Sequence, residues 1–283
     1  MPVANFSRIV IIQSLFPNDE FTGTKLHEDI EILNVFHGLG LDVELVNVKN
    51  RHELMETFRK IEEKTKENEG YPLLHLEIHG SDDATGIVLS SHDYISWEEL
   101  KEPLTRINVA CRLNLIIILA VCHGAHLTKI VQPVDRAPCW GLIGPTKEIE
   151  SGFILKSFYD FYKALLEKGS GGEALRALKQ ANEQSSLKGV YHFTNAEYFF
   201  KKVYMRYVQE ECSSKGLTKR AKRMYRKLKN EKGSSIRSVG QLKRHLKRTQ
   251  EEYFYKYANN FFMCDLYDEN KSRFKVEYKD VLG

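Results

Sequence analysis

Short apolar runs alternate with amphipathic stretches along the first 190 residues of the chain. The longest run, Leu115–Val121, consists only of aliphatic residues and includes three consecutive isoleucines. Such a run is typical of a strand that is buried on both faces of a sheet. Further apolar or alternating runs predict strands at Ile9–Leu15, Val43–Val48, Tyr71–Gly80 and Cys139–Gly144.

Helices are predicted between these strands, because apolar residues recur there at intervals of three and four. The predicted helices are Lys25–His37, His52–Lys66, Trp97–Ile107, Gly152–Lys168 and Glu173–Gln184. We also expect a loop at Phe21–Thr24, and a small hairpin outside the main sheet at Ile87–Leu89 and Tyr94–Ile95. Strands that alternate with helices predict an α/β fold with a mostly parallel sheet and helices on both faces.

Beyond about residue 190 the pattern becomes mainly helical. Helices are predicted at Tyr198–Cys212, Thr218–Lys229 and Val239–Tyr257, and short strands at Phe261–Leu266 and Arg273–Tyr278. This change of pattern divides the chain into an α/β domain over residues 1–190 and a C-terminal, mainly helical region over residues 191–283.

Charge is distributed unevenly over these regions. Counting Asp, Glu, Lys and Arg, residues 1–200 carry a net charge of −8, residues 201–250 carry +14 and residues 251–283 carry −2. The sequence therefore predicts a basic appendage on a mildly acidic body. Its most basic part, residues 215–248, suits nucleic acid or an acidic protein as a partner, although ordinary solvated helix faces have the same composition.

No apolar run approaches the roughly 20 residues of a membrane-spanning helix, so we expect no membrane partner. The first apolar run is not followed by a signal-peptide cleavage site, and we interpret it as the first strand. An odd number of widely spaced cysteines favours reduced thiols and a cytoplasmic location. The cysteines are Cys111, Cys122, Cys139, Cys212 and Cys264.

A cysteine and a histidine stand at the ends of two predicted buried strands. Cys122 directly follows the Leu115–Val121 run, and His79 and Gly80 close the strand that begins at Tyr71. In open α/β sheets, ligands and reactive groups gather at the carboxyl ends of the strands. A thiol and an imidazole in these positions are candidates for a nucleophile and its general base.

The order of these motifs resembles that of the caspase-like cysteine peptidases, which include caspases, metacaspases and the CHAT peptidases of bacteria. One strand ends in His-Gly, a later apolar strand ends in Cys with Gly two residues on, and 43 residues separate His79 from Cys122. Caspases place about 50 residues there. The stretch TGTKLHEDIEILNVFHGLGLDVELVNVKNRHELMETFRKI is similar to the first two helices and second strand of a caspase, and WGLIGPTKEIESGFILKSFYDFYKALLEKGSGGEALRALKQA is similar to the CHAT pattern.

The resemblance implies a cysteine endopeptidase that cleaves a protein substrate, uses no metal or cofactor and responds to an activating protein partner. By position, Cys122 is the nucleophile and His79 the general base, because a nearby imidazole lets the reactive thiolate form at neutral pH. The backbone N–H groups of Gly80 and Cys122 would bind the oxyanion of the tetrahedral intermediate. Gly80 suits this role because it has no Cβ atom to block close approach. In bacteria such peptidases serve in antiphage defence or regulated cell death.

Two positions depart from the family pattern. In the family, both help to bind P1, the substrate residue on the acyl side of the scissile bond. Phe21 stands where caspases have an Arg, and Ala120 stands where caspases have a Gln and metacaspases an Asp. These residues predict an uncharged P1 side chain, because a buried charge without a counter-charge is costly. Glu148 and Glu150, after the next strand, could instead supply an acid that selects Lys or Arg.

Maturation is expected to differ from that of caspases, which are cut in a long linker after the catalytic cysteine. Only Ala125–Pro138 separates Cys122 from the next predicted strand. We therefore expect a single-chain enzyme without this cleavage.

Roles other than catalysis remain open for several of these residues. A buried cysteine is often only a small apolar side chain, which is our interpretation of the other four. Glu77 could orient His79, or it could be a solvated or ion-paired carboxylate. A zinc site is a further option, built from Cys122, His123, His126 and His79. The main alternative function is an inactive caspase-like scaffold that binds protein or nucleic-acid partners through residues 201–283.

Overall fold

The computed structural model describes residues 5–181, 189–229 and 238–281, which divide into two compact units. Unit 1 contains Met1–Ile130 and Pro138–Ala196, and unit 2 contains Val131–Ala137 and Glu197–Gly283. The chain thus leaves unit 1 after Ile130 and returns to it at Pro138.

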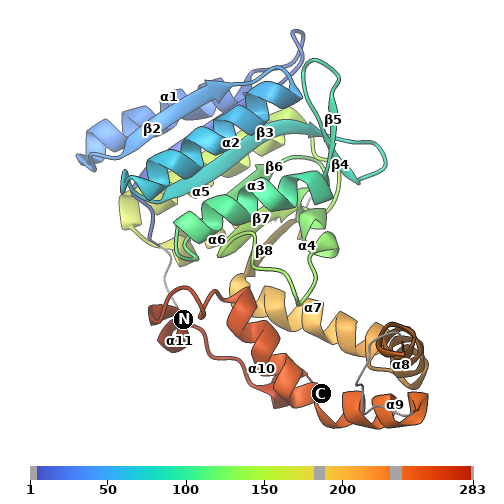
Figure 1. Cartoon of the computed structure of the whole chain (residues 1–283). Coiled ribbons are helices and arrows are strands. Elements are labelled where there is room, and N and C mark those ends of the chain that lie inside the picture. Colours follow the sequence, from blue (N-terminus) through green and yellow to red (C-terminus); the bar gives the residue numbers. More distant parts are fainter. Residues whose placement is uncertain (1–4, 182–188, 230–237, 282–283) are drawn as a thin grey trace. The chain divides into compact units, whose positions relative to one another are not determined.

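Unit 1 is built on a mixed, mostly parallel sheet (Figure 1). The described strands are β1 (Arg8–Ser14), β2 (Asp42–Asn47), β3 (Pro72–Gly80), β4 (Gly86–Val88), β5 (Tyr94–Ser96), β6 (Ile116–Ala120), β7 (Gly141–Pro145) and β8 (Tyr191–Asn195). The main strands lie in the order β2-β1-β3-β6-β7-β8, and all these neighbours are parallel except β7 and β8. β4 pairs antiparallel with the end of β3, and β5 pairs antiparallel with β4.

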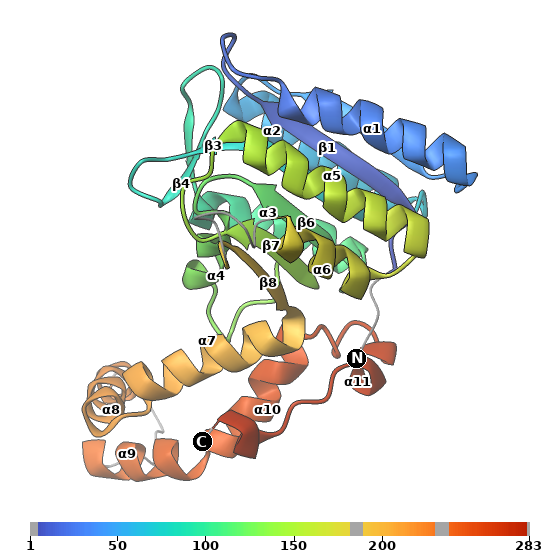
Figure 2. The ribbon, with the colours of Figure 1, turned by 180° about the vertical axis from the view of Figure 1, so that it is seen from behind.

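Helices cover both faces of this sheet, as the sequence predicts. The helices of unit 1 are α1 (Thr22–His37), α2 (Arg51–Lys66), α3 (Trp97–Ala110), the 3-10 turn η1 (Gly124–His126), α4 (Leu127–Ile130), α5 (Ser151–Lys168) and α6 (Gly171–Gln180). α2 and α3 lie in front of the sheet in Figure 1. The view from behind in Figure 2 shows α1, α5 and α6 on the opposite face.

Burial explains why the central strands consist of continuous apolar runs. All seven residues of β1 are buried, and so are the first seven of β3. Alternate residues of each strand enter two separate apolar cores, one on each face of the sheet. In β6, Ile117 and Leu119 join the core under α2 and α3, whereas Ile118 and Ala120 join the core under α1 and α5. The predicted α/β fold with helices on both faces is therefore confirmed.

Three local predictions in unit 1 need correction. The segment Phe21–Thr24 is not all loop, because α1 begins at Thr22. The β4–β5 hairpin is not outside the main sheet, because β4 pairs with His79 and Gly80 at the end of β3. The sequence also misses β8, whose residues are only partly buried. Residues 182–184 of the predicted helix Glu173–Gln184 lie outside the described residues.

Unit 2 is mainly helical. Its helices are α7 (Ala196–Glu211), which starts at the last residue of unit 1, α8 (Ser214–Leu228), α9 (Val239–Arg248), α10 (Gln250–Phe261), α11 (Glu269–Arg273) and the 3-10 turn η2 (Tyr278–Val281). Aromatic side chains form most of the contacts among α7, α10 and the following turn, namely those of Phe199, Phe200, Tyr204, Phe254, Phe261 and Phe262. α8 and α9 pack together around a smaller apolar core of their own.

Three predicted elements of unit 2 are wrong. The single helix predicted at Val239–Tyr257 is two helices, because α9 ends at Arg248 and α10 begins at Gln250. Phe261–Leu266 is the end of α10 and a turn, and Arg273–Tyr278 connects α11 to η2. None of the helices in the described parts of the chain is both long and apolar enough to cross a membrane.

Candidate active site

The register of the parallel strands brings His79 and Cys122 to the same place at the carboxyl edge of the sheet. The last paired residues of β3 and β6 are Glu77 and Ala120. Beyond these residues Gly80, the last residue of β3, lies against Cys122 in the turn after β6. Both residues line one cavity.

Gly80 lets the end of β3 lie directly against Cys122. A Cβ atom at position 80 would collide with the carbonyl oxygen of Cys122 and lie 3.0 Å from its Cβ atom. In the β3–β4 ladder, the Ser81 N–H donates to the Gly86 carbonyl oxygen. Because bonded and non-bonded positions alternate in an antiparallel ladder, the Gly80 N–H points away from β4. The amides of Gly80 and Cys122 are therefore candidates to bind an oxyanion.

The turn after Cys122 is fixed by close backbone packing. His123 takes a left-handed conformation with φ 61°, and the Gly124 N–H donates to the Val121 carbonyl oxygen at 2.9 Å. A Cβ atom at Gly124 would lie 2.7 Å from the Leu119 Cβ atom, so the chain turns tightly against β6. Cys122 is consequently held in a strand-to-helix turn at the rim of the cavity.

A carboxylate from the neighbouring strand end holds His79. Asp19, in the loop after β1, accepts a hydrogen bond from His79 Nε2 at 2.7 Å. The same Oδ2 atom accepts the Phe16 N–H at 2.7 Å. Partial burial opposes the charge of Asp19, but these hydrogen bonds outweigh it and hold the pKa of Asp19 below its ordinary value. An ionised carboxylate only accepts hydrogen bonds, so the Nε2 of His79 carries the proton and the Nδ1 of the neutral ring is left as a base.

Aromatic stacking also restrains the His79 ring. The Phe16 ring stacks on it with centroids 4.9 Å apart and planes inclined by 18°. On its other side, Phe16 stacks on His92 with centroids 4.8 Å apart. Asp19 follows β1, His79 lies at the end of β3 and Cys122 follows β6; these three strands are adjacent in the sheet. Three neighbouring strand ends thus supply an acid, an imidazole and a thiol in spatial order.

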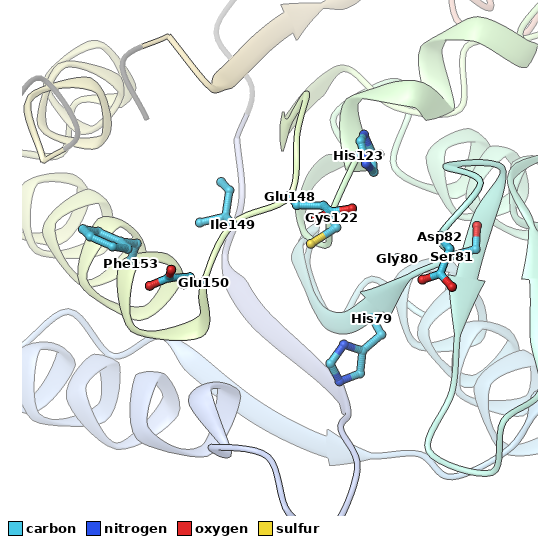
Figure 3. A pocket seen from close by; sticks show the side chains of 10 residues that line it. All are labelled: His79, Gly80, Ser81, Asp82, Cys122, His123, Glu148, Ile149, Glu150 and Phe153. Carbon is cyan, nitrogen blue, oxygen red and sulfur yellow. The ribbon is translucent and has the colours of Figure 1, made fainter. Parts of the chain in front are cut away.

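A cavity of about 550 Å³ opens at this edge of the sheet (Figure 3). Its lining comes from the ends of β3, β6 and β7 and the start of α5, and consists of His79, Gly80, Ser81, Asp82, Cys122, His123, Glu148, Ile149, Glu150 and Phe153. In Figure 3, Glu150 and Phe153 lie across from the Cys122 sulfur and the His79 ring. The thiol and the imidazole are therefore both open to a bound molecule.

A second cavity of about 560 Å³ adjoins the first. Both are lined by His79, Gly80, Ser81 and Asp82. Phe16, Val88 and Tyr94 from the β1 loop and the β4–β5 hairpin are among the other residues of the second lining. The two cavities therefore meet at the end of β3, and Cys122 belongs to the lining of the first.

The glutamates predicted as one option for P1 binding line the first cavity, and the other two candidates do not. Glu148 and Glu150 belong to its lining. Ala120 is buried in the core under α5, and Phe21 lies just before α1, outside the lining of both cavities. With Asp82, the wall carries three carboxylate side chains, and none of the described lining residues is Lys or Arg.

Glu77 does not orient His79. It is buried, and its carboxylate accepts hydrogen bonds from His75 Nε2 at 2.9 Å and from Thr22 Oγ1 at 3.0 Å. The Tyr162 hydroxyl lies 3.1 Å from the Nδ1 atom of His75. Burial raises the pKa of Tyr162 well above its ordinary value, so this hydroxyl stays protonated and donates. Glu77 is thus neither solvated nor part of the Cys122 site.

Three of the other four cysteines are buried, and Cys212 is half-buried like Cys122 but does not line the cavity. Desolvation raises the pKa of Cys111 to about 12, and also raises the pKa values of Cys139, Cys212 and Cys264. These thiols stay protonated near neutral pH, and a protonated thiol is a poor nucleophile. Cys122 is only half-buried and lines the cavity.

The zinc alternative gains no support. Within residues 5–181, 189–229 and 238–281, no three His, Cys, Asp or Glu side chains lie close enough to share a metal ion. His123 Nδ1 instead lies 3.3 Å from the Thr146 carbonyl oxygen, and His126 Nδ1 lies 3.3 Å from the Ala84 carbonyl oxygen.

Asp19 is the site residue that the sequence analysis misses. The available signal is its place shortly after a buried strand, at the sheet edge where His79 and Cys122 also lie.

No protein-family model matches this chain, and no curated protein matches it at a significant level. The functional interpretation therefore depends on the site geometry and on the motif resemblance.

Proposed function

We propose that this protein is a cysteine endopeptidase of the caspase-like type that cleaves a protein substrate. One observation carries the proposal: His79 at the end of β3 and Cys122 just after the neighbouring strand β6 line one cavity, and Asp19 is bonded to the imidazole. The order of the His-Gly and Cys motifs supports the same function. A cysteine with only a structural role would need neither an open cavity nor an oriented base.

The His79 imidazole acts as the general base and later as the general acid. Its Nδ1 takes the thiol proton of Cys122, and the thiolate sulfur bonds to the carbonyl carbon of the scissile peptide. When the C–N bond breaks, the leaving amine takes this proton and the acyl group remains on the sulfur as a thioester. Water, losing a proton to His79, then hydrolyses the thioester. The thiol is restored and a new carboxyl terminus leaves.

Backbone amides stabilise the tetrahedral intermediates. The N–H groups of Gly80 and Cys122 lie beyond the last residues paired between β3 and β6 and next to the nucleophile. Donors fixed where negative charge develops need no rearrangement during the reaction, and the loss of one such donor costs about 10²- to 10³-fold in rate.

The substrate class follows from the charges of the cavity. Glu148, Glu150 and Asp82 favour a cationic side chain, Lys or Arg, at P1. The adjoining second cavity accommodates further substrate residues. A polypeptide with an exposed, extended segment around a basic residue is therefore the proposed substrate.

The activity requires a reduced nucleophile. All five cysteines are free thiols. A reducing compartment such as the cytoplasm keeps them in this state.

A peptide library that is randomised at P1 tests the activity and the specificity together. We expect cleavage after Lys and Arg by the wild type and none by Cys122→Ala. Combining Glu148→Gln with Glu150→Gln should lower the preference for Arg over Leu by about 10-fold or more, because the counter-charge is removed. Glu67→Gln with Glu69→Gln is the matched control, since both side chains are exposed and lie outside the cavity lining.

Thiol labelling distinguishes an enzyme from an inactive scaffold. Iodoacetamide should label Cys122 fastest, and His79→Ala should slow this labelling, whereas Cys212→Ser should leave it unchanged. Slow labelling of Cys122 together with no cleavage of the library would instead favour the scaffold. Cleavage after Asp would contradict the proposed role of the glutamates.

A further inference from the structure

The helix pair α8–α9 of unit 2 has two sides of different chemistry. Leu217, Ala221, Leu242 and Leu246 are buried between the helices, and Met224, Tyr225, Leu228 and Val239 pack against them. The apolar side of each helix therefore already has a partner in the other helix. The sides that remain for solvent are polar.

These solvent-facing sides carry a dense set of cations. α8 contains seven Lys and Arg residues and α9 contains four, and neither helix contains Asp or Glu. The exposed cations, which we call the cationic face, are Lys215, Lys219, Lys222, Arg223, Arg226 and Lys227 on α8 and Arg244, Lys247 and Arg248 on α9. Intervals of three and four place them on one side of each helix.

Among the described residues, no carboxylate forms an ion pair with the cationic face. Surface cations of unit 1 commonly meet carboxylates, as Arg59 does with Glu56 and Glu63. The α8 cation nearest a carboxylate is Arg220, 3.9 Å from Glu211, and it is not part of the cationic face. The cationic face is therefore available to an anionic partner.

The row of cations on α8 fits a regularly repeating anion. From Lys215 to Lys227 it extends about 18 Å, at 1.5 Å per residue of helix. A nucleic-acid strand in a duplex carries one phosphate every ~3.4 Å, so the row spans roughly five phosphates. The match in sign and length is a form of charge complementarity that requires no base-specific contact.

Other polyanionic partners fit less well. An amphipathic helix binds a membrane by burying its apolar side in the lipid, but the apolar sides of α8 and α9 are buried against each other. A protein partner needs aromatic or apolar anchors at the centre of the interface. Of the large apolar side chains exposed in the described residues, none lies on α8 or α9. We propose that the cationic face binds the phosphodiester backbone of nucleic acid, independently of the peptidase activity and without reading base sequence.

The test is fluorescence anisotropy with the full chain and three labelled probes of equal length: duplex DNA, single-stranded DNA and single-stranded RNA. The wild type should bind, and its affinity should fall steeply as salt rises from about 50 to 200 mM, because counterions are released from the phosphates. The quadruple variant Lys219→Gln, Lys222→Gln, Arg223→Gln and Arg226→Gln should bind about 100-fold more weakly. For this variant, the slope of log affinity against log salt concentration should be less negative by about three to four units. The order among the probes identifies the kind of nucleic acid.

The control removes the same charge elsewhere. Lys60, Lys163, Lys168 and Lys179 are exposed on unit 1, and their replacement by Gln should leave binding within about 3-fold of wild type. Circular dichroism should show both variants folded, since Gln, Lys and Arg have similar helix propensities. No binding of any probe by the wild type, or equal weakening in both variants, would overturn the proposal. Tighter binding of polyglutamate than of all three probes would overturn it in favour of an acidic protein.

Discussion

Strand β3 carries two imidazole–carboxylate pairs that differ in their surroundings. In the inner pair, His75 and Glu77 are 2.9 Å apart, and their side chains are 0% and 3% exposed. In the outer pair, His79 and Asp19 are 2.7 Å apart, and their side chains are 40% and 33% exposed. Of the two imidazoles, His79 lines a cavity together with a thiol, and His75 is in the lining of neither cavity.

Position along the strand produces this difference. The inner pair lies where β3 is still paired with β6, and helix residues complete its hydrogen bonds, Thr22 from α1 and Tyr162 from α5. The outer pair lies beyond the last paired residue of β6, so one side of the ring is open. The same two functional groups therefore stabilise the fold when they are enclosed and become available for chemistry when one side is open.

The largest expected effect is on catalysis, at the outer pair. His79→Ala should lower the rate of peptide cleavage by at least about 10³-fold, because the nucleophile loses its base. The free energy of unfolding in urea should change by less than about 1 kcal/mol, since the ring is partly exposed. His92→Ala is the control: it removes the other ring stacked on Phe16 and should keep the rate within about 3-fold.

The inner pair should give the opposite result. His75→Phe leaves the Glu77 carboxylate buried without its imidazole, which should lower the free energy of unfolding by about 3–5 kcal/mol. The double variant His75→Phe with Glu77→Leu should recover much of this loss, because no unpaired carboxylate remains. Cleavage per folded molecule should stay close to wild type in the double variant. A loss of cleavage as large as that of His79→Ala would mean that the inner pair also takes part in catalysis.

Substitutions of Asp19 should have smaller effects on the rate. Asp19→Asn keeps an oxygen that accepts hydrogen bonds and removes the charge, and should slow cleavage about 10-fold. Asp19→Ala removes both and should slow it about 100-fold, because the imidazole also loses its fixed orientation. Initial rates at saturating substrate measure this difference. Equal, wild-type rates in both variants would show that Phe16 stacking alone positions the ring.

The smallest expected effect is the contribution of Asp19 to stability. The pKa of Asp19 is lower in the folded chain than its ordinary value of about 3.9, so folding favours the charged form. This contribution is complete above the unfolded pKa and is lost as the pH falls through the folded pKa. Wild type should therefore exceed Asp19→Ala by at most about 1 kcal/mol near neutral pH, and the difference should vanish once the pH lies below the folded pKa. Urea unfolding at several pH values measures it, and a difference that grows on acidification would contradict the assignment.

Local patterns are sufficient to predict the strands that are buried on both faces and the places of His79 and Cys122 at strand ends. Strands such as β1 and β6 are buried on both faces, so their composition alone identifies them. His79 and Cys122 are predictable because a strand end is a local feature. Asp19 is not, because its bond to His79 joins residues 60 apart in sequence and depends on the loop after β1. Ala120 fails as a cavity residue because it lies within the paired part of β6, where its face is covered by a helix.

The errors in unit 2 arise from packing that no local signal specifies. The chain breaks at Thr249 without a Pro or Gly. Leu242 and Leu246 of α9 face α8, whereas Phe254 of α10 packs in the aromatic core, and one straight helix would not serve both. The apolar segment that begins at Phe261 has the composition of a strand, but its rings fill this helical core.

Val131–Ala137, the seven residues of unit 2 that lie between α4 and β7, contact residues that the ribosome synthesises much later. The Ala137 N–H donates to the Phe261 carbonyl oxygen, and Arg136 binds both carboxylate oxygens of Asp265, 129 residues downstream. A ribosome that adds 5–20 residues per second needs roughly 6 to 26 seconds to reach these partners. The hydrogen bonds of Arg136 with Asp265 therefore form only after translation has passed residue 265, although Arg206 is available to the Val131 carbonyl oxygen earlier. A chain that stalls after β7 but before Phe261 contains the residues of β1 to β7. It lacks the partners that bind Arg136 and Ala137 in the connection between β6 and β7.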